Sequence, residues 1–225
     1  MTHDFNAWYA TLTALQFTIC MVLFVYMKIQ SKRQARPIKV VRLYLGLQWL
    51  AWFALNLCFV EILNIEKHYL ENVESISRFI VLVAFYYSLD SRAEYIKAIF
   101  IAVPVFLLFL WIIEWNIDNL NFILRLANGV AGITLGSIFF RRLLRELPVE
   151  NLGRYPLFWF NTAFIIRSGG IVWMAVLITF SFPMKSIDGA LLKEFFSVLG
   201  VVEYLLLLLG IANLENKEIR KEANV

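Results

Sequence analysis

Histidine is scarce in this chain: its 225 residues include only His3 and His68, and both lie outside the apolar stretches. A zinc hydrolase or a two-histidine heme inside a membrane needs histidine ligands at membrane depth, so both classes are excluded. A retinal Schiff base needs a lysine deep in a helix, and the last apolar stretch has only Lys193, near its start. Ser168 has no histidine to act as its base, and the sequence has no glycine-rich phosphate loop. We therefore expect no enzyme, no metal and no cofactor.

Charge and cysteine are also scarce. Charged residues make up 17% of the chain and hydrophobic residues 60%, a composition that soluble domains rarely have. The two cysteines, Cys20 and Cys58, fall within apolar stretches, where a thiol packs as a small hydrophobic group. The composition predicts an integral membrane protein, and we expect it in the cytoplasmic (inner) membrane of a bacterium.

Apolar runs recur along the chain at lengths suited to a bilayer, which a helix crosses in about 20 residues. The connecting segments are short, so residues 1–225 are expected to form a single all-α transmembrane domain without a soluble domain. The third run predicts a membrane span least strongly, and the alternative to a full span there is a half-helix that stops at Arg78. The seven predicted spans are 10–27, 41–62, 73–89, 96–115, 120–140, 157–182 and 191–214.

Lysine and arginine are concentrated on one side of the predicted bundle. The linker before the second span, alternate later loops and the C-terminal tail hold 15 of them, whereas the other side has only Lys67, Lys185 and Lys193. Because cytoplasmic loops carry the excess of basic residues, the N-terminus is predicted outside and the C-terminus in the cytoplasm. This charge reflects topology and contact with membrane lipid, and we expect no nucleic-acid partner.

Three arginines, Arg78, Arg125 and Arg167, lie within predicted spans, together with Glu203, and Glu61 lies at a span rim. Insertion scales assign each such charge a cost of about 2.5 to 3.5 kcal/mol, so an ionisable residue at this depth indicates a functional site. At 1.5 Å per residue from the cytoplasmic edge, Arg78, Arg167 and Glu203 are all about 18 Å deep.

Two asparagines join this layer, with Asn128 at about 20 Å and Asn56 at about 21 Å. Arg125 follows at about 24 Å and Glu61 at about 28 Å. The predicted ligand-binding site therefore lies between mid-membrane and the outer rim, and it comprises Arg78, Arg125, Arg167, Glu203, Asn56, Asn128 and Glu61.

Small residues accompany the charges on single helix stripes. Arg125 shares its stripe with Gly129, Gly132 and Gly136, at spacings of four, seven and eleven residues. Because small residues let two helices approach closely, this stripe is expected to face protein and not lipid.

Two interpretations of the charges remain open. One pairs Arg167 with Glu203 and the other arginines with acidic residues at the rim (Glu61, Glu74 or Glu114), since charges in a membrane usually pair with each other. The other is an outward-facing polar cavity in which a surplus guanidinium binds a carboxylate or phosphate group. In the second case the Arg167–Glu203 pair becomes a latch that an anion loosens.

Three functions fit this architecture. The first is a sensor or receptor-like module that binds a small anionic ligand and signals to a cytoplasmic or membrane protein partner. The second is a permease or channel subunit for an anionic solute, which predicts polar residues continuing to the cytoplasmic edge. The third is a structural subunit of a larger membrane complex, in which another chain covers the charged stripes.

Overall fold

The computed structural model describes residues 2–29, 36–53, 67–89, 98, 101, 117–146, 151–181 and 189–215. This part of the chain contains six α-helices, two short 3-10 helices and no β-strand. The predicted all-α fold is therefore confirmed for the described residues.

Each of the six helices overlaps one of the predicted spans, although residues 54–62 of the second span lie outside the described residues. The α-helices are α1 (Thr2–Ile29), α2 (Arg36–Phe53), α3 (Lys67–Leu89), α5 (Ile117–Glu146), α6 (Pro156–Ser181) and α7 (Gly189–Ala212); the 3-10 helices are η3 (Leu152–Arg154) and η5 (Asn213–Glu215). Helix α3 continues through Arg78, where the half-helix alternative requires it to stop. The predicted span 96–115 lies outside the described residues apart from positions 98 and 101.

Three of these helices are long and apolar enough to cross a membrane, over Thr11–Ile29, Pro156–Leu177 and Phe195–Ala212. Large apolar side chains also cover their outer faces: Val22 is 56% exposed and Trp173 is 57% exposed. Extended apolar surface of this kind is rare on soluble monomers. Both observations are consistent with an integral membrane protein.

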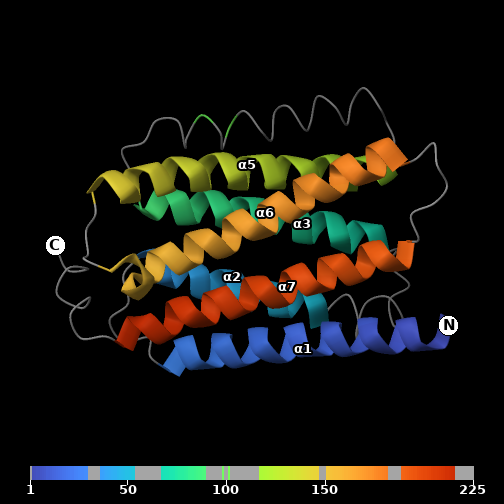
Figure 1. Ribbon diagram of the computed structural model, residues 1–225, viewed down its shortest axis with the longest axis horizontal. Helices are drawn as coiled ribbons and strands as arrows, with labels where there is room; N and C mark the ends of the chain where they lie inside the picture. Colours follow the sequence, from blue (N-terminus) through green and yellow to red (C-terminus); the bar gives the residue numbers. More distant parts are fainter. Residues whose placement is uncertain are drawn as a thin grey trace.

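The described helices form a ring. Contacts join α1 to α2, α2 to α3, α3 to α5, α5 to α6, α6 to α7 and α7 back to α1. Figure 1 shows α1, α2 and α3 running in alternating directions, as do α5, α6 and α7, with the start of α1 and the end of α7 at opposite ends. Each helix can therefore direct one face towards the inside of the ring and another outwards.

Basic residues gather at the end of the ring where α1, α3, α5 and α7 finish and α2 and α6 begin. We call this the basic end. In the described part of the chain it carries Lys28, Arg36, Lys39, Arg42, Arg141, Arg142, Arg145 and Arg154. The opposite end has fewer basic residues, with Lys67 and Lys193 near the first turns of α3 and α7.

Helices α5 and α6 approach closely because glycines line their contact. A Cβ atom at Gly129 would lie 2.7 Å from a methyl of Val172, and one at Gly132 would lie 2.8 Å from the Cβ of Ser168. Real side chains do not approach this closely, so a larger residue would force the helices apart. The predicted packing stripe of α5 is confirmed at these positions.

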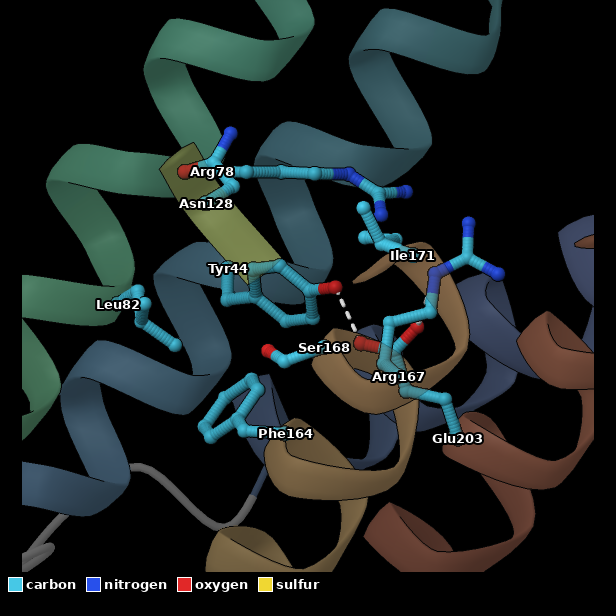
Figure 2. A pocket seen from close by; sticks show the side chains of 9 residues that line it. All are labelled: Tyr44, Arg78, Leu82, Asn128, Phe164, Arg167, Ser168, Ile171 and Glu203. Carbon is cyan, nitrogen blue, oxygen red and sulfur yellow. Dashed lines mark hydrogen bonds and ion pairs between the residues drawn. The ribbon is translucent and has the colours of Figure 1, made fainter. Parts of the chain in front are cut away.

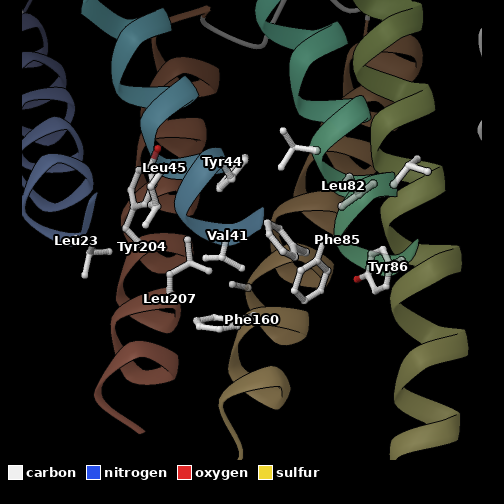
Figure 3. Packing of buried hydrophobic residues seen from close by; sticks show 14 of the residues in the cluster. Leu23, Val41, Tyr44, Leu45, Leu82, Phe85, Tyr86, Phe160, Tyr204 and Leu207 are labelled. Carbon is white, nitrogen blue, oxygen red and sulfur yellow. The ribbon is translucent and has the colours of Figure 1, made fainter. Parts of the chain in front are cut away.

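The core of the ring is apolar and aromatic (Figure 3). Phe164 meets the rings of Tyr44 and Phe85 edge-on, at centroid distances of 5.4 and 5.1 Å. This cluster locks α2, α3 and α6 together. Val41, Leu45, Phe85, Phe160 and Leu207 have no exposed surface.

Candidate functional site

A partly open cavity of about 40 Å³ lies inside the ring, where five helices contribute its lining. The elements that meet there are α2, α3, α5, α6 and α7. Figure 2 shows its side chains: Tyr44, Arg78, Leu82, Asn128, Phe164, Arg167, Ser168, Ile171 and Glu203. Two guanidinium groups and one carboxylate thus share a small space at mid-length of the helices.

Glu203 is the most buried charged group of the site, with 1% of its surface exposed. The hydroxyl of Tyr44 donates a hydrogen bond to its Oε1 atom, and Nε of Arg167 lies 3.7 Å from its Oε2 atom. The predicted pairing of Arg167 with Glu203 is therefore present, although 3.7 Å exceeds a hydrogen-bond length. One carboxylate on α7 thus joins α2 and α6.

Arg167 makes its described contacts with α7. Its Nη1 donates to the backbone oxygen of Phe196 at 2.9 Å, and its guanidinium carbon lies 5.6 Å from the centre of the Phe196 ring. A cation over an aromatic face is attracted to that ring. With Glu203, these contacts make Arg167 a clamp between α6 and α7.

Arg78 is held from two sides. Its Nη2 atom donates to Oε1 of Gln48 at 2.5 Å and lies 2.9 Å from Oε1 of Glu74, one turn earlier on α3. Gln48 therefore fixes Arg78 against α2, and Glu74 balances part of its charge. Glu74 is one of the rim carboxylates that the sequence offered as partners.

Asn128 connects α5 to α3. Its Nδ2 atom donates to the backbone oxygen of Ser75 at 2.7 Å. Because only the amide nitrogen can donate to a carbonyl, this bond fixes which way the side chain faces. Its Oδ1 atom is buried and has no hydrogen-bond partner among the described residues.

Each cavity arginine has a buried donor that makes no hydrogen bond among the described residues. These donors are the Nε atoms of Arg78 and Arg167, and that of Arg167 lies 3.7 Å from Oε2 of Glu203. Buried polar atoms are nearly always hydrogen-bonded to protein or water. The two Nε donors therefore make the cavity a candidate site for a bound acceptor.

Apolar side chains lie on the basic-end side of the cavity. Phe85 follows Arg78 along α3, and Phe164 and Phe160 precede Arg167 along α6, so all three lie towards the basic end. All three side chains are buried. The polar groups beyond this layer bind one another: Tyr86 donates to Asn161 at 2.7 Å. On this side of the cavity the described layer is therefore apolar at these three positions, and the polar pair Tyr86–Asn161 is bonded internally.

The structure brings together four of the seven predicted site residues: Arg78, Asn128, Arg167 and Glu203 line the cavity. Arg125 is partly buried on α5 and does not belong to this lining. Asn56 and Glu61 lie outside the described residues. Among the residues that the structure describes, no group of three His, Cys, Asp or Glu side chains could hold a metal ion.

Sequence reasoning missed the role of Tyr44. The second span was taken to start at residue 41, which placed Tyr44 at the cytoplasmic edge, below the charged layer. Helix α2 instead begins at Arg36, so Tyr44 is eight residues into it and about 12 Å along its axis. Its spacing of four residues from Gln48 was the available signal, because it puts both polar side chains on one helix face.

The chain matches no protein-family model, no curated protein and no solved structure.

Proposed function

We propose that this chain is a membrane sensor module whose cavity binds a small anion and whose helices pass the occupancy of that cavity to a protein partner in the cytoplasm. One observation supports this most: two guanidinium groups, whose Nε donors make no hydrogen bond among the described residues, line a cavity that five helices share. A ligand there contacts enough elements to change how they pack.

In this proposal the chain crosses the membrane seven times, with its N-terminus outside and its basic end in the cytoplasm. The positive-inside rule supports this orientation, since eight basic residues of the described part lie at that end. The alternation of helix directions in Figure 1 is compatible with it. In this orientation these basic residues contact the anionic lipids of the inner leaflet.

The clamp between α6 and α7 gives the ligand a way to act. An anion that approaches Nε of Arg167 competes with Glu203, whose oxygen is already 3.7 Å away. Glu203 keeps its hydrogen bond from Tyr44, so α7 stays attached to α2 while its contact with α6 weakens. A ligand shifts a conformational equilibrium only by binding one state better, and this competition supplies such a difference.

A permease for an anionic solute is the second candidate, since the same arginines would bind cargo. It requires a path to the cytoplasm, and the buried phenylalanines Phe85, Phe160 and Phe164 occupy that direction. A structural subunit would bury its charges against another chain, whereas Arg78, Arg167 and Glu203 line a cavity within this one. Both observations favour sensing.

Site-specific photo-crosslinking in native membranes tests the proposal. The crosslinker replaces Arg145, which is exposed at the basic end, and in a matched control it replaces Val198, which is exposed on the outer face of α7. Sensing predicts a protein partner captured from position 145 with a yield that changes when the cavity anion is added, and no such change from position 198. Accumulation of a labelled anion in vesicles that contain only the purified chain would instead establish transport.

A further inference from the structure

The size of the cavity limits what it can hold. Its volume is about 40 Å³, and a water molecule needs roughly 10 to 15 Å³ of such space. The cavity therefore has room for about three to four non-hydrogen atoms. Phe164 cannot easily move to enlarge it, because the rings of Tyr44 and Phe85 pack against it edge-on.

The charge of the lining limits the ligand further. Among the described lining residues Arg78 and Arg167 are positive and Glu203 is negative, so together they carry one net positive charge. Glu74 contacts Arg78 from outside the cavity and lowers this surplus further. A divalent anion would therefore leave more uncompensated negative charge in an apolar environment than a monovalent anion, and such charge is costly.

The donors of the lining define where an anion sits. The Nε–H groups of Arg78 and Arg167 make no hydrogen bond among the described residues, and that of Arg167 lies 3.7 Å from Oε2 of Glu203. In the view of Figure 2 both guanidinium groups lie on the side of the cavity where the Tyr44 hydroxyl meets Glu203, with Leu82 and Asn128 across from them. An anion on this side can accept from either guanidinium with charge-assisted hydrogen bonds.

From volume, charge and donors together we infer that the cavity ligand is a small monovalent anion, from a halide to a three- or four-atom oxyanion such as formate or nitrate. Phosphate, sulfate and dicarboxylates are larger and carry more charge, so we expect them to bind more weakly. This inference rests on the proposed anion-binding function and narrows it to a ligand class.

Chloride-35 NMR on the full chain in lipid nanodiscs tests this class, with gluconate keeping the ionic strength constant. Chloride that exchanges with a protein site gives a broadened line, and competing anions remove the broadening. We expect bromide, nitrate and formate to displace chloride at about tenfold lower concentration than phosphate, sulfate or succinate, a difference of about 1.4 kcal/mol in binding free energy. This series uses the unaltered chain, so it does not depend on any variant folding.

Two variants locate the site. Arg167→Gln is expected to abolish the chloride broadening, and Arg154→Gln, which removes an exposed arginine at the basic end, is expected to leave it unchanged. Equal loss in both variants would mean that chloride binds to surface charge and would overturn the inference. Displacement by phosphate or succinate as strong as by nitrate would overturn the ligand class while leaving anion binding intact. A chain that broadens no chloride line and responds to no anion in the series would refute anion binding itself.

Discussion

The hydroxyl of Tyr44 on α2 donates a hydrogen bond to the carboxylate of Glu203 on α7, 159 positions later in the sequence. Glu203 is only 1% exposed, so α2 supplies a hydrogen-bond donor to a buried charge. On its other side the same carboxylate faces Arg167 of α6. Three helices thus converge on one buried negative charge, and the first two predictions concern the contacts around it.

Tyr44→Phe removes this hydrogen bond and keeps the ring that packs on Phe164. Hydrogen bonds to charged groups contribute about 1.5 to 3 kcal/mol in soluble proteins, and interhelical bonds in membranes average less, so we expect a loss of about 1 to 3 kcal/mol. The free energy of unfolding in mixed detergent micelles measures it. Tyr87→Phe is the matched control, because Tyr87 is 42% exposed on α3. Equal stability of the two variants would show that the bond to Glu203 contributes nothing.

A double-mutant cycle on Arg167 and Glu203 measures the clamp. Removing one partner of a buried pair leaves the other charge uncompensated, so Arg167→Gln and Glu203→Gln should each cost about 3 kcal/mol of unfolding free energy. The double variant should cost less than their sum by about 0.5 to 3 kcal/mol, the range for residues in contact.

The control cycle combines Glu203→Gln with Arg154→Gln, which is remote and exposed, and its effects should add. Exchanging the two charges, Arg167→Glu together with Glu203→Arg, is expected to restore stability only in part. A glutamate at position 167 cannot donate a hydrogen bond to the backbone oxygen of Phe196. Additive effects in the Arg167 cycle itself would remove the pair as a structural link.

The close contact of α5 with α6 predicts opposite responses from two glycines. Gly132→Ala places a Cβ atom 2.8 Å from the Cβ of Ser168, so overpacking should cost about 1 to 3 kcal/mol. Gly169→Ala meets no atom within 4 Å and replaces a flexible helix residue, so it should change stability by no more than about 1 kcal/mol and in the stabilising direction. Thermal unfolding of both variants compares them, and a Gly132→Ala variant as stable as the unaltered chain would contradict the packing seen here.

The sequence was a good guide to the helices because their apolar runs are long and bounded by charge. Helix α6 starts at Pro156, one residue before the predicted start, since proline fits the first turn of a helix. Helix α5 extends to Glu146, six residues past its predicted end, because leucine and arginine favour helix beyond the apolar limit.

The site was harder to predict than the helices. Depth counting brought Arg78, Arg167, Asn128 and Glu203 together, because residues at one depth on neighbouring helices can meet. It could not identify Gln48 or Phe196 as partners, since a side-chain amide and a backbone oxygen carry no signal of which neighbour they bind. Those contacts depend on helix rotation, which spacing along one helix does not determine.

The orientation in the membrane can be tested by labelling single cysteines with a membrane-impermeant maleimide, in a chain whose Cys20 and Cys58 are replaced by alanine. His3→Cys should react in intact cells, and Arg141→Cys should react only after the membrane is opened, since basic ends of helices stay in the cytoplasm. The reverse pattern would invert the topology and place the basic end outside.

The most direct test of the central claim measures whether an anion in the cavity moves the basic end. Spin labels at Arg154→Cys, just before α6, and Ala212→Cys, at the end of α7, report the distance between these helices by pulsed electron paramagnetic resonance. The account predicts that formate or nitrate shifts this distance by about 2 Å, the scale of helix shifts in switching proteins, and that Arg167→Gln abolishes the shift. An unchanged distance while chloride-35 NMR shows the anion bound would contradict it.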